Sequence, residues 1–218
     1  EKCTNKNKQI EYFPNWAEDV FTEKNKNIET PELPEGFNVM FAGNIGESQG
    51  FEGVLDAAEH TKNHNINWIL VGDGRKVSWI KSEIKKRQIE NIYLLGRHPL
   101  ETMPSFFKKS DAMLVSLKNE PIFALTVPAK VQAYMASGKI ILGMLNGEGK
   151  LLINKSGSGF AVNAGESKLL AGNCIKLSKF SSEEKKEMEE KSSKYYEDNF
   201  SKEKLFSKLD LLFQEFKK

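Results

Sequence analysis

The sequence predicts an α/β domain with a Rossmann-like, doubly wound parallel sheet, and three observations support this fold class. Short apolar runs alternate with amphipathic helical stretches from Asn38 onward. Glycines recur where the apolar runs end, as they do where a strand turns sharply toward a helix. The last two helical stretches carry mixed charge, and no further strand follows them. Such alternation indicates βαβ units with helices on both faces of the sheet.

The expected elements follow one another along the chain. Short, mostly apolar runs predict strands at 38–42, 66–71, 91–95, 111–116, 140–145 and 158–162. Apolar side chains at helical spacing predict helices at 51–63, 76–88, 102–109, 128–137, 166–177, 181–198 and 201–217. In a sheet of this kind, ligands bind beyond the carboxyl ends of the strands.

Three segments are expected. Residues 1–37 form a linker, because three prolines stand there among lysine and asparagine, and residues 38–180 form the Rossmann-like domain. Residues 181–218 form C-terminal helices, whose apolar stripe is interpreted as core. The stripe comprises Tyr195, Phe200, Leu205, Leu209, Leu212, Phe213 and Phe216. Since the chain starts at Glu1 without methionine, it is interpreted as a piece of a longer protein.

The composition excludes several classes of protein. The 218 residues are 39% hydrophobic and 28% charged, with a formal net charge of +2, so an extended nucleic-acid-binding surface is not expected. Cys3 and Cys174 are too few for a disulfide scaffold, which favours a reducing cytoplasm. The chain contains no run of about 18 apolar residues that would span a membrane, and no signal peptide is expected.

The stretch 126–143 is the most informative part of the chain. Thr126 or Val127 is expected at a helix cap, with Pro128 in the first turn and Gly138 as the left-handed stop. Lys130 then lies in the first turn, where the helix dipole favours an anion. A cation there is useful if a bound anion is held by the lysine and the free amides together. The alternative is an ordinary surface lysine.

Three glycine turns follow successive predicted strands, at 43–46, 72–75 and 96–98. The first is not the dinucleotide fingerprint, because the third glycine is misplaced and the acidic residue is absent. No Asp-x-Asp pair occurs, and the histidines lack metal-ligand spacing, so no metal is expected. Arg75, Arg97, Lys130 and helix amides would therefore meet the charge of a phosphate.

These motifs together resemble the C-terminal half of a family-4 glycosyltransferase. The matching stretches are Phe41–Gly46, Leu70–Arg75, Leu95–Arg97 and Val127–Lys139. The resemblance is strongest to the bacterial branch of L-fucosamine transferases, and Tyr12–Trp16 is similar to that branch's interdomain crossing segment. It implies the GT-B architecture of two Rossmann-like domains, with a missing N-terminal domain toward which the C-terminal helices pack.

The resemblance also implies which residues contact the nucleotide-sugar donor. They are Gly43, Asn44 and Gly46 (diphosphate), Gly72, Asp73, Gly74 and Arg75 (nucleotide), Arg97 and His98 (near the base), and Thr126, Val127 and Lys130 (phosphates and ribose). Lys130 is in addition the expected catalytic residue, because it would stabilise the diphosphate leaving group.

The sequence departs from the family at four positions. Asn44 and Gln49 stand where many members carry arginine and lysine. The paired family glutamates fall at Leu125 and Ala133, and Glu120 lies nearby in the wrong register. Nucleotide binding is therefore better supported than the usual carboxylate contacts to sugar and ribose.

The implied function is the donor-binding half of a retaining glycosyltransferase. It would transfer an N-acetylated amino sugar from a UDP donor, without a cofactor, to a lipid-linked or saccharide acceptor in surface polysaccharide biosynthesis. The acceptor would bind the missing domain, so the chain alone is expected to be inactive. The full-length protein would be cytoplasmic, with peripheral association at the inner membrane face left open. Two alternatives stand: a sugar-nucleotide 2-epimerase half, and a non-catalytic nucleotide-binding or interaction subunit.

Overall fold

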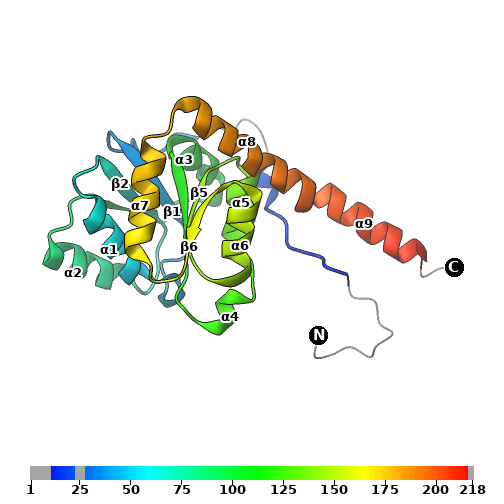
Figure 1. Ribbon diagram of the computed structural model, residues 1–218, viewed down its shortest axis with the longest axis horizontal. Coiled ribbons are helices and arrows are strands. Elements are labelled where there is room, and N and C mark those ends of the chain that lie inside the picture. Colours follow the sequence, from blue (N-terminus) through cyan, green and yellow to red (C-terminus); the bar gives the residue numbers. More distant parts are fainter. Residues whose placement is uncertain (1–10, 23–27, 216–218) are drawn as a thin grey trace.

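The fold of the chain is known from a computed structural model that describes residues 11–22 and 28–215. A six-stranded sheet lies between two layers of helices, and the last helix, α9 Lys202–Glu215, extends away from it (Figure 1). All paired strands are parallel, in the order β3-β2-β1-β4-β5-β6. The strands are β1 Phe37–Ala42, β2 Ile66–Val71, β3 Ile92–Gly96, β4 Ala112–Ser116, β5 Ile141–Met144 and β6 Gly159–Val162. The predicted fold class is confirmed.

The helices fill the connections between strands. They are α1 Phe51–Thr61, α2 Val77–Arg87, α3 Met103–Lys109, α4 Pro121–Ala124, α5 Ala129–Ala136, α6 Gly147–Ser156, α7 Ser167–Ser178, α8 Ser182–Asn199 and α9 Lys202–Glu215. Short 3-10 turns are η1 Asp19–Phe21, η2 Glu47–Gln49 and η3 Leu100–Thr102. Helices α4 and α6 were not predicted from the sequence, because α6 has glycine at its first and third positions and α4 is a single turn.

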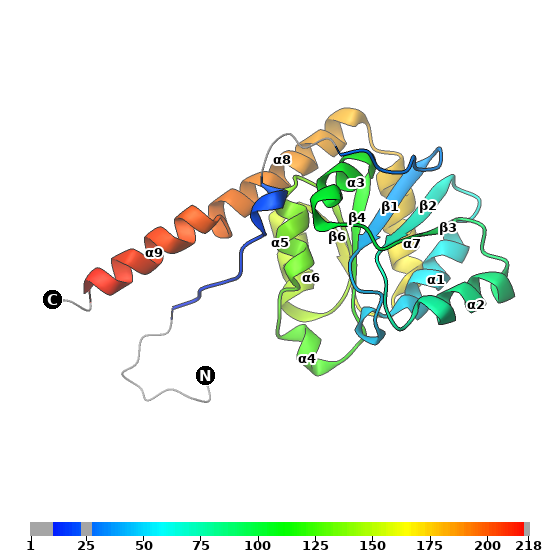
Figure 2. The same ribbon diagram turned by 180° about the vertical axis from the view of Figure 1, so that it is seen from behind.

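Successive side chains of a strand point to opposite faces of the sheet, and each face has its own hydrophobic core. In β1, Val39 and Phe41 pack in the core beneath α1, α2 and α7, whereas Met40 and Ala42 pack beneath α3, α5 and α6. Every residue of β1 and β2 is buried, as expected for central strands covered on both faces. Figure 2, seen from behind, shows the layer that α3, α5 and α6 form on the second face.

The C-terminal helices only partly match the prediction of plain core. A capping box between Ser181 and Glu184 starts α8, which packs against α5 and α6. Phe200 and Leu205 are buried as predicted, but α9 then runs away from the sheet and Phe213 is 57% exposed, so the prediction of core is wrong at that end of the stripe (Figure 1). Phe216, the last residue of that stripe, lies outside the described residues.

The N-terminal segment 11–22 lies along α8 and α9 and returns to the sheet. The Ala17 N–H donates to the Tyr196 hydroxyl at 3.3 Å, and Asp19 pairs with Lys202 at 3.2 Å. The ring of Phe21 then stacks on Phe107 of α3, with centroids 5.4 Å apart. These contacts hold η1 against α3 and α5.

Candidate functional site

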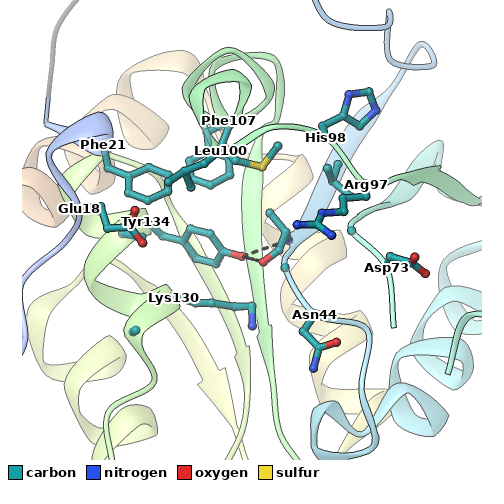
Figure 3. Close-up of a pocket in the computed structure, with 17 residues that line it drawn as sticks. Glu18, Phe21, Asn44, Asp73, Arg97, His98, Leu100, Phe107, Lys130 and Tyr134 are labelled. Atoms are coloured by element: carbon teal, nitrogen blue, oxygen red, sulfur yellow. Dashed lines mark hydrogen bonds between the residues drawn. The ribbon is translucent and has the colours of Figure 1, made fainter. Parts of the chain in front are cut away.

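A cavity of about 560 Å³ opens at the carboxyl ends of the strands. From β1 the chain adds β2 and β3 on one side of the sheet and then β4, β5 and β6 on the other. Doubly wound sheets bind ligands at this switch point, between β1 and β4. Five segments line it, at 18–21, 42–44, 71–73, 97–107 and 129–134, and Figure 3 shows their side chains around the cavity. The lining residues are Glu18, Phe21, Ala42, Gly43, Asn44, Val71, Gly72, Asp73, Arg97, His98, Leu100, Met103, Phe107, Ala129, Lys130, Ala133 and Tyr134.

Backbone hydrogen bonds lock the loops at the floor of this cavity together. Ile45 N–H donates to the Asp73 carbonyl at 2.8 Å, and Gly72 N–H donates to the Gly96 carbonyl at 2.7 Å. Gly72 has φ +140°, and a β-carbon there would collide with the carbonyl of Gly43. Glycine is required because the two loops approach backbone to backbone.

Lys130 is the cation at the centre of the site. It lies in the first turn of α5, whose N-cap residue Pro128 provides no side-chain cap for the free amides. Its ammonium lies 4.8 Å from the centre of the Phe41 ring and 3.4 Å from the Gln49 amide oxygen. Burial lowers the pKa of Lys130, and no carboxylate pairs with it among the residues that the structure describes. The lysine is thus positioned for an anion from outside.

Tyr134 fixes α5 relative to the end of β1. Its buried hydroxyl accepts from the Ala42 N–H at 3.2 Å and donates to the Ala42 carbonyl at 3.3 Å. The ring packs edge-on against Phe107 at 5.2 Å. Burial raises the pKa of the Tyr134 hydroxyl, so it stays a neutral donor. Lys130, one turn earlier on the same helix, is thereby held over the loop after β1.

An apolar wall forms another side of the cavity. Phe21 and Phe107 stack nearly parallel, with 3° between their planes, and Leu100 and Met103 continue the wall. At its edge, His98 Nε2 lies 3.2 Å from the Leu95 carbonyl oxygen. Such a wall suits a flat ring, whereas the opposite floor presents glycine loops and Lys130 (Figure 3).

The cavity brings together seven of the twelve residues predicted to bind the donor. They are Gly43, Asn44, Gly72, Asp73, Arg97, His98 and Lys130. The other five do not line it. These are Gly46, Gly74, Arg75, Thr126 and Val127. Their binding roles, and those of the seven, stay predictions.

The cap of α5 differs from the prediction by one or two residues. Pro128 itself is the N-cap, so placing the cap at Thr126 or Val127, with Pro128 in the first turn, is wrong. The stop is confirmed, because Gly138 has φ +65° and the Lys139 N–H bonds the Tyr134 carbonyl at 2.9 Å.

Four residues that line the cavity were not predicted from the sequence: Glu18, Phe21, Leu100 and Met103. Glu18 and Phe21 are distant in sequence from the strand-end loops and follow the Tyr12–Trp16 segment, whose resemblance to a crossing segment was the available signal. Phe107 is a core residue at 2% exposure, and it also lines the cavity.

The structure shows no cluster suited to a metal ion in the region it describes. No three histidine, cysteine, aspartate or glutamate side chains there gather at ligand distance. Cys174 is buried with a free thiol, and Cys3 lies outside the described residues. Within the same ranges, no helix is long and apolar enough to cross a membrane.

The sheet order and the strand-end cavity define a Rossmann-like α/β domain of the kind that makes up GT-B glycosyltransferases. The chain belongs to the family described as Glycosyl transferases group 1, whose profile matches residues 23–195. The family part of the predicted resemblance is therefore confirmed.

Two curated relatives are similar in sequence. The probable glycosyltransferase WbjE of Pseudomonas aeruginosa is 30% identical over 160 residues, which cover 70% of this chain and 40% of the relative. The putative colanic acid biosynthesis glycosyl transferase WcaI of Escherichia coli K12 is 27% identical over 138 residues, which cover 58% of this chain and 33% of the relative. The chain thus spans two fifths or less of these relatives' length.

Among solved structures, Alr3699/HepE of Anabaena in complex with UDP and glucose has the same fold. The TM-score is 0.66 at 19% identity, and the match covers 82% of this chain and 48% of the other.

Proposed function

We propose that this chain is the donor-binding part of a glycosyltransferase that takes its sugar from a UDP-linked donor. In this proposal the sugar is an N-acetylated amino sugar, and the acceptor is a lipid-linked or free saccharide bound mainly by a further domain. The product belongs to a surface polysaccharide in this proposal, and the relative WcaI is named for colanic acid biosynthesis. The L-fucosamine transferase-like branch, retention at the anomeric carbon and a cytoplasmic location belong to the same proposal.

The observation that carries the proposal is the half-buried Lys130, which has no carboxylate partner in the described part of the chain and lies at the uncapped start of α5. A diphosphate placed there would meet the ammonium and the free amides together. When the bond between sugar and diphosphate breaks, negative charge grows on the leaving oxygen. Lys130 would stabilise that charge without any movement, because Tyr134 holds α5 in place.

The apolar wall supports the nucleoside part of the donor. Phe21, Phe107 and Leu100 lie across the cavity from the glycine loops, so a base against this wall would leave the diphosphate toward Lys130 (Figure 3). HepE, which has the same fold, was solved with UDP. A sugar-nucleotide 2-epimerase could use the same cavity, and assay of the full-length protein with sugar nucleotide, with and without acceptor, separates the two.

Calorimetric titration of the 218-residue chain with UDP and with uridine, in the presence of chelator, tests the proposal. We expect UDP to bind with a Kd of roughly 10 µM to 1 mM, and uridine at least about tenfold more weakly, because it lacks the phosphates. An absolute requirement for magnesium would contradict the metal-free site. Absence of nucleotide binding would favour the interaction-subunit alternative instead.

A further inference from the structure

Glu18 brings a carboxylate to the cavity from outside the Rossmann-like sheet. It belongs to the N-terminal segment and lines the cavity together with Ala133 and Tyr134 of α5. In Figure 3 its side chain lies beside Phe21 and Tyr134, on the side of the cavity away from Asp73. No ion pair or side-chain hydrogen bond occupies its carboxylate within the described ranges.

The neighbours of Glu18 hold it in this place. Ala17 is 4% exposed and bonded to Tyr196, and Asp19 is paired with Lys202. Glu18 itself has extended backbone angles, φ −61° and ψ 147°, between these two anchored residues. The segment therefore presents the carboxylate at the cavity without using it for its own attachment.

The cavity has no carboxylate at Leu125 or Ala133, the two positions where the paired family glutamates fall. Ala133 lines the cavity with a methyl group only, and Leu125 is 74% exposed and outside it. Glu120 does not line the cavity either. Asp73 does, but its carboxylate already accepts the Gly74 N–H at 2.7 Å. Among the residues that line the cavity, Glu18 is the carboxylate beside Tyr134 of α5 (Figure 3).

We propose that Glu18 accepts hydrogen bonds from the ribose hydroxyls of the donor nucleotide and so replaces the carboxylate absent at Ala133. This inference rests on the proposed function. With the diphosphate at Lys130 and the base against Phe21 and Phe107, the ribose lies between them, next to Glu18. Carboxylates bind the vicinal hydroxyls of a ribose because both hydroxyls donate and an ionised carboxylate only accepts.

The test compares UDP with 2′,3′-dideoxy-UDP by calorimetry, in wild type, Glu18→Gln and Asp19→Asn. Wild type is expected to bind UDP about tenfold or more tightly than the dideoxy compound, since charge-assisted hydrogen bonds are lost. In Glu18→Gln this preference should fall to about threefold or less, because a neutral amide accepts more weakly. Asp19→Asn is the matched control, since Asp19 faces Lys202 and not the cavity.

The outcomes separate this inference from the proposed function. If wild type binds UDP but the preference is the same in Glu18→Gln, or absent from the start, the role of Glu18 is refuted and the donor site stands. If wild type does not bind UDP at all, the proposed function fails. Loss of the preference in Asp19→Asn to the same degree would also overturn the inference, because the effect would then come from the segment as a whole.

Discussion

Replacing Lys130 by methionine should separate ligand binding from stability. Methionine keeps much of the unbranched stem that packs near Phe41 and Gly43 but removes the ammonium. If the ammonium holds the diphosphate, the variant loses a charge-assisted interaction of about 1.5–3 kcal/mol, and UDP affinity should fall roughly tenfold to hundredfold. Calorimetric titration measures this change directly.

The stability of the unliganded protein should respond in the other direction or not at all. A cation in the first turn of a helix costs about 0.3–1 kcal/mol, whereas its contact with the Phe41 ring at 4.8 Å contributes a similar amount. Burial adds a cost, because it lowers the pKa of Lys130 in the folded state. We therefore expect the free energy of unfolding of Lys130→Met to lie within about 1 kcal/mol of wild type, or slightly above it.

The pH dependence has a defined sign. A lysine whose folded pKa is below its unfolded value destabilises the protein while it is charged, and this cost disappears as the pH rises through the folded and then the unfolded pKa. Any stability advantage of Lys130→Met should consequently be largest near neutral pH and shrink at alkaline pH. Denaturant unfolding of wild type and Lys130→Met, at neutral and at alkaline pH, measures this difference in stability.

Lys150→Met is a matched control for the binding effect. Lys150 lies near the start of the neighbouring helix α6, contacts Asn163 at 2.7 Å and does not line the cavity. Its substitution should leave UDP affinity unchanged. Lys139 is a poorer control, because it is 8% exposed and paired with Glu189 of α8. Equal UDP affinity in wild type and Lys130→Met would refute the phosphate-binding role.

Three further substitutions concern backbone strain at glycines and an ion pair of α2. Gly43→Ala should lower both UDP affinity and the free energy of unfolding, the latter by about 1–3 kcal/mol, because φ is +134° and the new β-carbon would lie 2.9 Å from Lys130 Cε. Gly172→Ala is its control. Gly172 lies in the middle of α7 with no atom near the new β-carbon, so this variant should be neutral or stabilising by up to about 1 kcal/mol. Glu83→Gln should destabilise the protein near neutral pH, since the hydrogen bond from Arg87 at 2.9 Å lowers the pKa of Glu83; the difference from wild type should be fully present above the ordinary glutamate pKa and vanish as the pH falls through the lower folded pKa. Titration and denaturant unfolding at several pH values check both, and a Gly43→Ala protein that binds and unfolds like wild type would contradict the first.

The sequence by itself determined the alternation of strands and helices, because those patterns are local. Short apolar runs such as Ile66–Val71 became buried strands, and Gly138 stopped α5 where a residue with positive φ was expected. The strand-end glycines and Lys130 were also identified from the sequence. They were assigned to a binding site because parallel sheets bind ligands at the carboxyl ends of their strands.

Only the tertiary structure decided which of these residues share one cavity. Arg75 and Asn44 both follow predicted strands, yet Asn44 lines the cavity and Arg75 does not. Glu18 reaches it through contacts with α8 and α9, more than 170 residues away along the chain. Such pairings depend on how distant helices pack, and the chain carries no local pattern for them. The carboxylate at this site was therefore visible only once the N-terminal segment was placed against α5.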